Sequence, residues 1–211
     1  MKKYVLLNLV IIAGLVFYLV INASSKTIDE RILVFNSSIL YEMNKNLDSA
    51  IAVIENSYKK YSGDYLFNVR LGWLYYSIGK FEKSLEYYNK AISIEPKNIE
   101  SQVGATYPLA KMEKQAEIIQ RYQTILKMDP MNYTANLYLG QIYLLKEKYT
   151  QAKELIQKAQ EQYPSYIEPN ISLGWTYFYL GDKLKAKEHF IYALMLNSEN
   201  ESAKEGLALV D

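Results

Sequence analysis

The residue types that most often carry out chemistry in proteins are scarce in this chain. Its 211 residues include no cysteine, and His189 is the single histidine. Without cysteine there is no disulfide, thiol nucleophile, iron–sulfur cluster or thiolate zinc site. One histidine also argues against a multi-histidine metal site, and a surface or hydrogen-bonded role is the expectation for it. The sequence therefore predicts no catalytic residue, no metal site and no cofactor, and we expect a protein that is not an enzyme.

Large aromatic side chains recur in this chain at a regular spacing, and they are better suited to binding a partner than to catalysis. Tyr107 follows Trp73 by 34 positions, and Trp175 follows Tyr107 by twice that spacing. Tryptophan and tyrosine are enriched among the residues that dominate binding energy at protein interfaces. Aromatic residues at helical spacing also serve as core. Binding and core packing therefore both remain open for the two tryptophans, while core packing is favoured for Tyr107, Phe178 and Tyr179.

The same spacing runs through the rest of the chain. Prolines recur every 34 positions at Pro96, Pro130 and Pro164, and the loop that ends at Ser198 falls on the next interval. Each interval holds an apolar stretch at helical spacing, then a glycine or a charged pair, then a second such stretch. A fixed period of this length indicates one helical hairpin copied and stacked.

Three of these intervals share a set of small and large residues at fixed places. Each contains a Leu-Gly pair in its first helical stretch, namely Leu71-Gly72, Leu139-Gly140 and Leu173-Gly174. Glycine permits a close helix crossing there, and the space beside it is expected to be filled by aromatic residues such as Tyr75, Tyr143 and Phe190. This pattern resembles the tetratricopeptide repeat family over about residues 31–198. The resemblance implies an all-α fold: a right-handed α-solenoid of about five stacked helix-turn-helix repeats with a C-terminal capping helix, preceded by an N-terminal hydrophobic helix.

The predicted organisation follows from this period. We expect a signal-anchor or signal peptide at 1–25, a short linker at 26–30, the repeat domain at 31–198 and the capping helix at 199–211. The repeats are expected at 31–64, 65–98, 99–132, 133–166 and 167–198. The first repeat is degenerate, with Ser37-Ser38 in place of Leu-Gly. The third has Pro108 inside its first helix, and we expect a kink there because proline lacks the N–H that would bond to the carbonyl four residues earlier.

The resemblance also implies where a partner would bind. In this family the first helices of the repeats line a concave groove, and one stripe of each helix faces the ligand. The corresponding residues of this chain are Val69, Trp73, Tyr76, Val103, Tyr107, Leu137, Gln141, Leu144, Ile171, Trp175, Phe178 and Tyr179. Most of them are apolar or aromatic, which would suit an extended or helical peptide.

The N-terminus carries a membrane-directed segment. Lys2 and Lys3 precede an apolar run over residues 4–21, which is interrupted by Asn8. As a helix this run would be about 27 Å long, close to the hydrocarbon thickness of a bilayer. We favour an uncleaved single-pass anchor, and the alternative is a signal peptide cleaved near Ser25. In both cases the N-terminus would lie in the cytoplasm and the repeats outside it, in a periplasmic or extracellular space.

These observations together favour a non-enzymatic binding module. The net charge of +1 provides no overall field that would attract nucleic acid, so no nucleic-acid partner is expected. We expect an adaptor or scaffold, held at the membrane through residues 4–21, that binds a protein or peptide partner in its groove. The alternatives are a self-assembling scaffold, which would be a homo-oligomer, and an accessory protein of a polysaccharide or envelope export machine.

Overall fold

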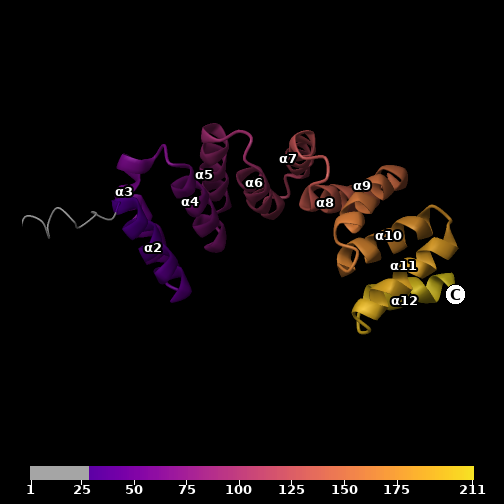
Figure 1. The fold of residues 1–211 in the computed structure, drawn as a ribbon. Coiled ribbons are helices and arrows are strands. Elements are labelled where there is room, and N and C mark those ends of the chain that lie inside the picture. Colours follow the sequence, from indigo (N-terminus) through magenta and orange to yellow (C-terminus); the bar gives the residue numbers. More distant parts are fainter. Residues whose placement is uncertain (1–28) are drawn as a thin grey trace, which may run out of the picture. The chain divides into compact units, whose positions relative to one another are not determined.

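The computed structural model describes residues 29–211, which divide between Ser57 and Tyr58 into two compact units. This part of the chain contains eleven α-helices and no strand, so the predicted all-α solenoid is confirmed (Figure 1). Within residues 29–211, no helix combines the length and the apolar composition needed to cross a membrane. The predicted hydrophobic segment at residues 4–21 lies outside the described residues.

The first unit consists of α2 (Glu30–Met43) and most of α3 (Leu47–Tyr61). The two helices are joined by a buried hydrogen bond, in which Ser38 Oγ donates to the carbonyl of Ala50 at 2.9 Å. The equivalent bond in the next repeat runs the other way, from Ser84 Oγ to the carbonyl of Gly72 at 2.7 Å. The serine that replaces glycine in the first repeat therefore maintains the link between the paired helices.

The second unit contains four helix pairs and a final helix. The helices are α4 (Tyr65–Ser77), α5 (Phe81–Ile94), α6 (Ile99–Lys111), α7 (Gln115–Met128), α8 (Tyr133–Leu145), α9 (Tyr149–Gln162), α10 (Ile167–Tyr179), α11 (Lys183–Leu196) and α12 (Glu201–Val210). α6 continues through the buried Pro108 to Lys111, and the kink expected there stays a prediction.

The turn inside each pair requires one residue with a left-handed backbone. Residues with positive φ recur every 34 positions and are Lys45 (60°), Gly79 (76°), Glu113 (57°), Glu147 (58°) and Gly181 (82°). Glycine adopts this conformation at no steric cost, whereas other residues pay about 1–2 kcal/mol. The turn geometry therefore explains the glycines at 79 and 181, whereas Lys45, Glu113 and Glu147 adopt the same conformation at a cost.

The helices pack through large side chains that lie against glycine backbones. A Cβ atom on Gly72 of α4 would lie 2.9 Å from the Tyr88 ring of α5, and one on Gly104 of α6 would lie 2.8 Å from Cδ1 of the same ring. Phe190 of α11 is enclosed in the same way by Gly174 of α10 and Gly206 of α12. Each of these rings thus fills two spaces: the one beside the glycine of its own repeat and the one beside the glycine of the helix that follows.

This arrangement corrects two of the residues expected to fill the space beside the glycines. Tyr75 stacks on Tyr87, with ring centroids 5.4 Å apart, and the residue next to Gly72 is Tyr88. Gly140 faces Ile156 rather than Tyr143. The residues that meet the glycines come from the second helix of each pair, because that helix crosses the first one at the glycine. Phe190, which belongs to a second helix, was predicted correctly.

A second repeated feature is a buried amide side chain near the start of α4, α6, α8 and α10, the first helices of the second unit. It recurs every 34 positions, at Asn68, Gln102, Asn136 and Asn170. The amide nitrogen donates to backbone carbonyls of the preceding loop; in Asn136, for example, Nδ2 donates to Pro130 and Asn132 at 3.0 Å each. These bonds fix the loop between repeats, because a buried carbonyl without a donor would cost about 1–3 kcal/mol.

The amide oxygen of this residue finds a partner nineteen positions later in two repeats. Arg121 donates to Gln102 Oε1 at 3.1 Å, and His189 Nδ1 lies 3.3 Å from Asn170 Oδ1. The fourth repeat has Leu155 at this place, and Asn136 Oδ1 is buried without a hydrogen-bond partner among the described residues. The core beside Asn136 therefore lacks a side-chain hydrogen bond that the third and fifth repeats make at the equivalent place.

We predict that Gly104→Ala lowers the free energy of unfolding by about 1–3 kcal/mol, because the new methyl group would overlap the Tyr88 ring. Gly63→Ala is the matched control, since a Cβ on Gly63 would have no other atom within 4 Å. Urea denaturation of the full chain followed by circular dichroism measures both. Equal midpoints for the two variants would contradict the proposed packing.

Candidate partner-binding groove

The predicted groove residues of α4 and α6 form a continuous aromatic surface. Trp73 and Tyr107 are 40% and 43% exposed, and Tyr76 lies half-buried between them. The ring centroid of Tyr76 is 5.9 Å from that of Trp73 and 5.8 Å from that of Tyr107. Val69 and Val103, on the same helices, are also half-buried. These contacts hold exposed rings of two successive repeats in one surface.

Trp175 has a different environment from Trp73, although both occupy the same place in their repeats. Trp175 is half-buried, its ring lies edge-on to Phe190 at 5.2 Å, and its Nε1–H donates to Ser202 Oγ of α12 at 2.8 Å. Phe178 packs edge-on against it at 5.8 Å. Trp175 thus helps to seat the final helix α12. Tyr179 is 51% exposed, and its ring stacks on Tyr149.

The stripe of α8 offers little apolar surface to a partner. Leu137 was predicted to line the groove, but it is 2% exposed and belongs to the core cluster that contains Ile156 and Leu173, so it is corrected to a core residue. The burial follows from its position where α8 packs against the next repeat. Leu144 and Ile171 are half-buried against the same cluster. Gln141 donates from Nε2 to Ser172 Oγ at 3.0 Å.

A cavity of about 430 Å³ lies where α6, α7 and α8 meet, and Gln141 is the one predicted groove residue in its wall. It is lined by Ala110, Glu113, Gln115, Ile118, Tyr122, Tyr138, Gln141, Ile142 and Leu145. Its size lies in the range typical of ligand sites. Leu145 is 81% exposed at this cavity, which leaves a large apolar side chain available.

Tyr138 accounts for the cavity between these repeats. The residues one period before and two periods after it are Gly104 and Gly206, which receive the rings of Tyr88 and Phe190. A tyrosine cannot receive a ring in that way, and Tyr122 stacks on Tyr138 with centroids 6.2 Å apart. This site was not predicted from the sequence, although the large residue at 138 stands out when the repeats are aligned at this position.

His189 is the one histidine of the chain, and its contacts are those of a structural residue. Among residues 29–211, no group of histidine and acidic side chains is arranged to hold a metal ion. The His189 ring stacks on Tyr177 with centroids 5.5 Å apart. The Asn170 amide nitrogen is occupied by backbone carbonyls, so its oxygen faces His189 and accepts from Nδ1–H. Burial lowers the pKa of His189 below its ordinary value of 6.5, and Lys185 lowers it further against the opposing effect of Glu188.

Comparison with family models relates the chain to a known repeat. Three models described as tetratricopeptide repeat match residues 69–98, 119–167 and 167–200. The third predicted repeat is covered less completely than its neighbours, in line with its irregular residues at 105, 106 and 108.

Among curated proteins, the chain is similar to parts of much longer proteins. BBSome complex member BBS4 of Bos taurus is 30% identical over 128 residues, which are 60% of this chain and 24% of that protein. Protein O-mannosyl-transferase TMTC1 of Homo sapiens is 26% identical over 140 residues, which are 63% of this chain and 16% of that protein. The chain thus spans about a quarter or less of these relatives.

Solved structures share the fold at low sequence identity. A tetratricopeptide repeat protein from Parabacteroides merdae has a TM-score of 0.73 and 19% identity, with 84% of this chain and 70% of that chain covered. YrrB, described as a TPR protein with an unusual peptide-binding site, has a TM-score of 0.67 and 17% identity, with coverage of 82% and 89%. At these identities the likeness establishes the fold.

We predict that the protein loses stability as the pH falls through about 6.5, because the unfolded chain takes up a proton at His189 before the folded chain does. This loss is absent well above pH 6.5 and levels off below the lowered pKa of the folded state. Urea denaturation between pH 7.5 and 5 measures it. His189→Gln should flatten the profile in this window, and an unchanged slope in that variant would contradict the assignment.

Proposed function

The chain belongs to the tetratricopeptide repeat family, and from this premise we propose that it is an interaction scaffold that holds a partner protein in the groove of α4, α6 and α8. The family fold supports binding of protein or peptide partners in general. The specific groove is our proposal, and the surface formed by Trp73, Tyr76 and Tyr107 is the observation that carries it.

This aromatic surface has the physical properties of a binding hot spot. Trp73 and Tyr107 expose large ring areas, and the contacts through Tyr76 hold both rings in place before a partner arrives. Ordered rings reduce the conformational entropy that binding would otherwise cost. Their truncation at interfaces typically costs about 2 kcal/mol or more per residue, or roughly thirtyfold in affinity.

The chemistry of the partner segment follows from the wall of the groove. An extended or helical peptide with apolar side chains would contact Trp73 and Tyr107 and place one large apolar side chain in the cavity beside Tyr138 and Leu145. Glu113 is the one charged residue lining that cavity, and it forms no ion pair within residues 29–211. A basic residue next to the apolar side chain would complement it.

The site and the repeats support a non-enzymatic role. The predicted groove residues that are exposed, Trp73, Tyr107 and Tyr179, are all aromatic. Three of the curated relatives are named as protein O-mannosyl-transferases, and this chain matches 16% of the length of each. We propose a binding role for this chain, because the exposed residues of the groove, Trp73 and Tyr107, are of the kind that anchor partners at protein interfaces.

We propose that the scaffold is displayed outside the cytoplasm, attached through the apolar run at residues 4–21. The two lysines that precede this run support a cytoplasmic N-terminus. The cysteine-free sequence suits an oxidising compartment, because no thiol can be mispaired there.

We predict that the double variant Trp73→Ala/Tyr107→Ala captures its partner at least tenfold less than the parent chain, because both exposed anchors are removed. The assay is crosslinking of the full chain in native membranes, purification and quantitative mass spectrometry. Tyr166→Ala is the matched control, since Tyr166 is 47% exposed and lies outside the groove. Circular dichroism verifies the fold. A folded double variant with unchanged capture would refute the groove. Trp175 is unsuitable for this test because it seats α12.

We predict that chain recovered from membranes retains its N-terminal apolar run, because residues 4–21 are long enough to span the bilayer. N-terminal sequencing decides between the two alternatives. A sequence that begins at Met1 or Lys2 agrees with an anchor, whereas one that begins at Lys26 would show cleavage after Ser25 and contradict it.

A further inference from the structure

The outer face of α11 exposes a row of large apolar side chains. Leu184, Ile191 and Met195 are 84%, 41% and 75% exposed, and Tyr192 and Leu196 beside them are 40% and 39% exposed. Leu184, Ile191 and Met195 are separated by seven and four positions, so they share one side of the helix. We refer to these five residues as the α11 patch.

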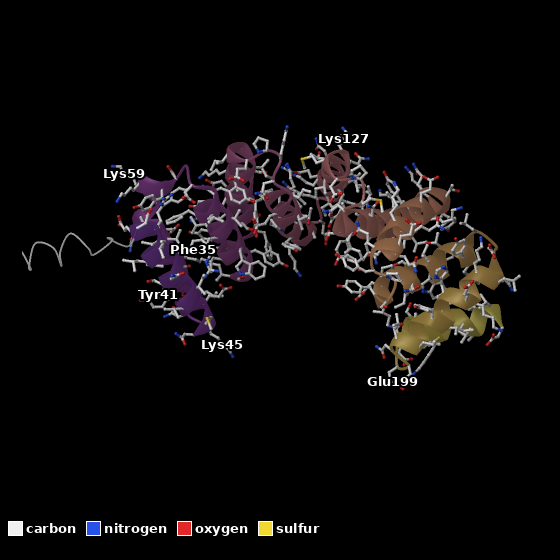
Figure 2. All side chains as sticks on the ribbon, viewed as in Figure 1. Phe35, Tyr41, Lys45, Lys59, Lys127 and Glu199 are labelled. Carbon is white, nitrogen blue, oxygen red and sulfur yellow. The ribbon has the colours of Figure 1, made fainter. Side chains whose placement is uncertain are left out.

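The other repeats provide an internal comparison for this patch. At the places of Leu184, Ile191 and Met195, the earlier second helices carry Thr150, Gln157 and Glu161 in α9, Ala116, Gln123 and Lys127 in α7, and Glu82, Asn89 and Ser93 in α5. Eight of these nine residues are polar or charged, and Lys127 is visible at the end of α7 in Figure 2. At the place of Ile191, Asn89, Gln123 and Gln157 each form a side-chain hydrogen bond with the next repeat, a bond that isoleucine cannot make. α11 therefore departs from a pattern that the chain itself maintains.

The core of the solenoid does not explain the departure. The inner face of α11 already packs through Ala186, Phe190 and Ala193, each 0% exposed. α12 covers the end of the array through Ala203 and Gly206, and Gly206 faces the inner residue Phe190. α11 is thus apolar on two sides, and only the inner side has a partner within residues 29–211. A second apolar side on one helix indicates a contact with another molecule.

The charges around the patch favour an antiparallel helix as its partner. Lys183, Lys185 and Lys187 lie in the first turns of α11, whereas its last turn has no basic residue. Glu199 and Glu201 follow its C-terminal end, and Glu199 is visible there in Figure 2. A helix macrodipole favours cations at the C-terminal end, the reverse of this distribution. Lys185 and Lys187 already pair with Asp182 and Asp211, and Glu199 and Glu201 pair with Lys204. These ion pairs are exposed and therefore weak. An antiparallel copy of α11 would bring its lysines, of which Lys183 forms no ion pair within residues 29–211, to that end and to the glutamates.

We propose that the α11 patch binds a second copy of this chain, α11 against α11 in antiparallel orientation, in a two-fold symmetric dimer. Leu184 of one copy would face Met195 of the other, and each Ile191 would lie near the centre. This contact is isologous, so the same surface serves both copies. It lies outside the groove of α4, α6 and α8 and does not depend on the function proposed for that groove.

The expected strength follows from the length of the contact. α11 has 14 residues and is about 21 Å long, so the interface belongs to the small class. We therefore expect a dissociation constant on the order of micromolar. Glu188 lies inside the row, is exposed and has no ion pair among the described residues. In the antiparallel contact its two copies would lie near the centre, beside Ile191, and they would limit the strength of the contact.

Because the chain has no cysteine, single introduced cysteines report the geometry without background. Leu184→Cys and Met195→Cys are produced as full chains in membranes, separately and together, and treated with a short bismaleimide. In the antiparallel dimer two copies of residue 184 are separated by about 16 Å along the helix axes, whereas residues 184 and 195 are adjacent. We expect a crosslinked dimer when the two variants are mixed and at least a tenfold weaker band for either variant alone.

A second variant tests whether the patch drives association. Leu184→Thr/Ile191→Gln/Met195→Glu introduces the residues that α9 carries at the same places, and Met131→Glu is the control on an exposed methionine outside the patch. Sedimentation of the full chain in a mild detergent should show the triple variant as a monomer, and the parent and control as concentration-dependent dimers.

Three results would overturn the proposal. Equal crosslinking of each cysteine variant with itself would show parallel or unspecific contact. Unchanged dimers of a folded triple variant would show that another surface mediates association. The third result is a monomeric chain in which the cysteines at 184 and 195 react with a water-soluble maleimide in detergent but not in membranes. That result would show that the patch lies against the membrane surface.

Discussion

The packing of this array depends on an aromatic ring enclosed by two glycine backbones. Tyr88 lies between Gly72 and Gly104, and Phe190 is enclosed by Gly174 and Gly206. In each case the ring belongs to a second helix, and the two glycines belong to the first helix of its own repeat and to the helix that follows. One side chain therefore joins two contacts, within a repeat and between neighbours, as stacked repeats require.

The array departs from this rule at α9, where Gly140 faces Ile156, and between α7 and α8, where a cavity lies beside the proposed groove. Tyr138 replaces the receiving glycine, Tyr122 stacks on it, and a cavity of about 430 Å³ remains open. Asn136 Oδ1 is also left without a partner among the described residues, because Leu155 replaces the donor found in other repeats. Local rules are most often broken at functional sites. In the function proposed above, the irregular junction would continue the groove that begins at Trp73 and would supply the space for an apolar side chain.

Much of the fold was predictable from the sequence, because a regular repeat period specifies which elements recur and how they stack. Less of the site was predictable. Trp73 and Tyr107 lie at the surface where the stripe placed them, but Leu137 is buried because α8 packs against the next repeat, and Trp175 is occupied by α12. The stripe was defined by the position of each residue within its own repeat. Such a definition does not take into account which side chains the neighbouring repeat or helix packs against that position. The loop-fixing amides and the α11 patch were missed because polar and apolar residues were assessed within single repeats rather than across equivalent positions.

Hydrogen exchange of the native full chain, resolved helix by helix, tests the central claim most directly, since it measures the free energy of local opening. On this account, rings enclosed by glycines keep the repeats together. In α7 the corresponding ring, Tyr122, stacks on Tyr138 instead. The free energy of local opening should therefore be lower for the amides of α7 than for those of α5 and α11. Equal or greater protection of α7 would contradict the account.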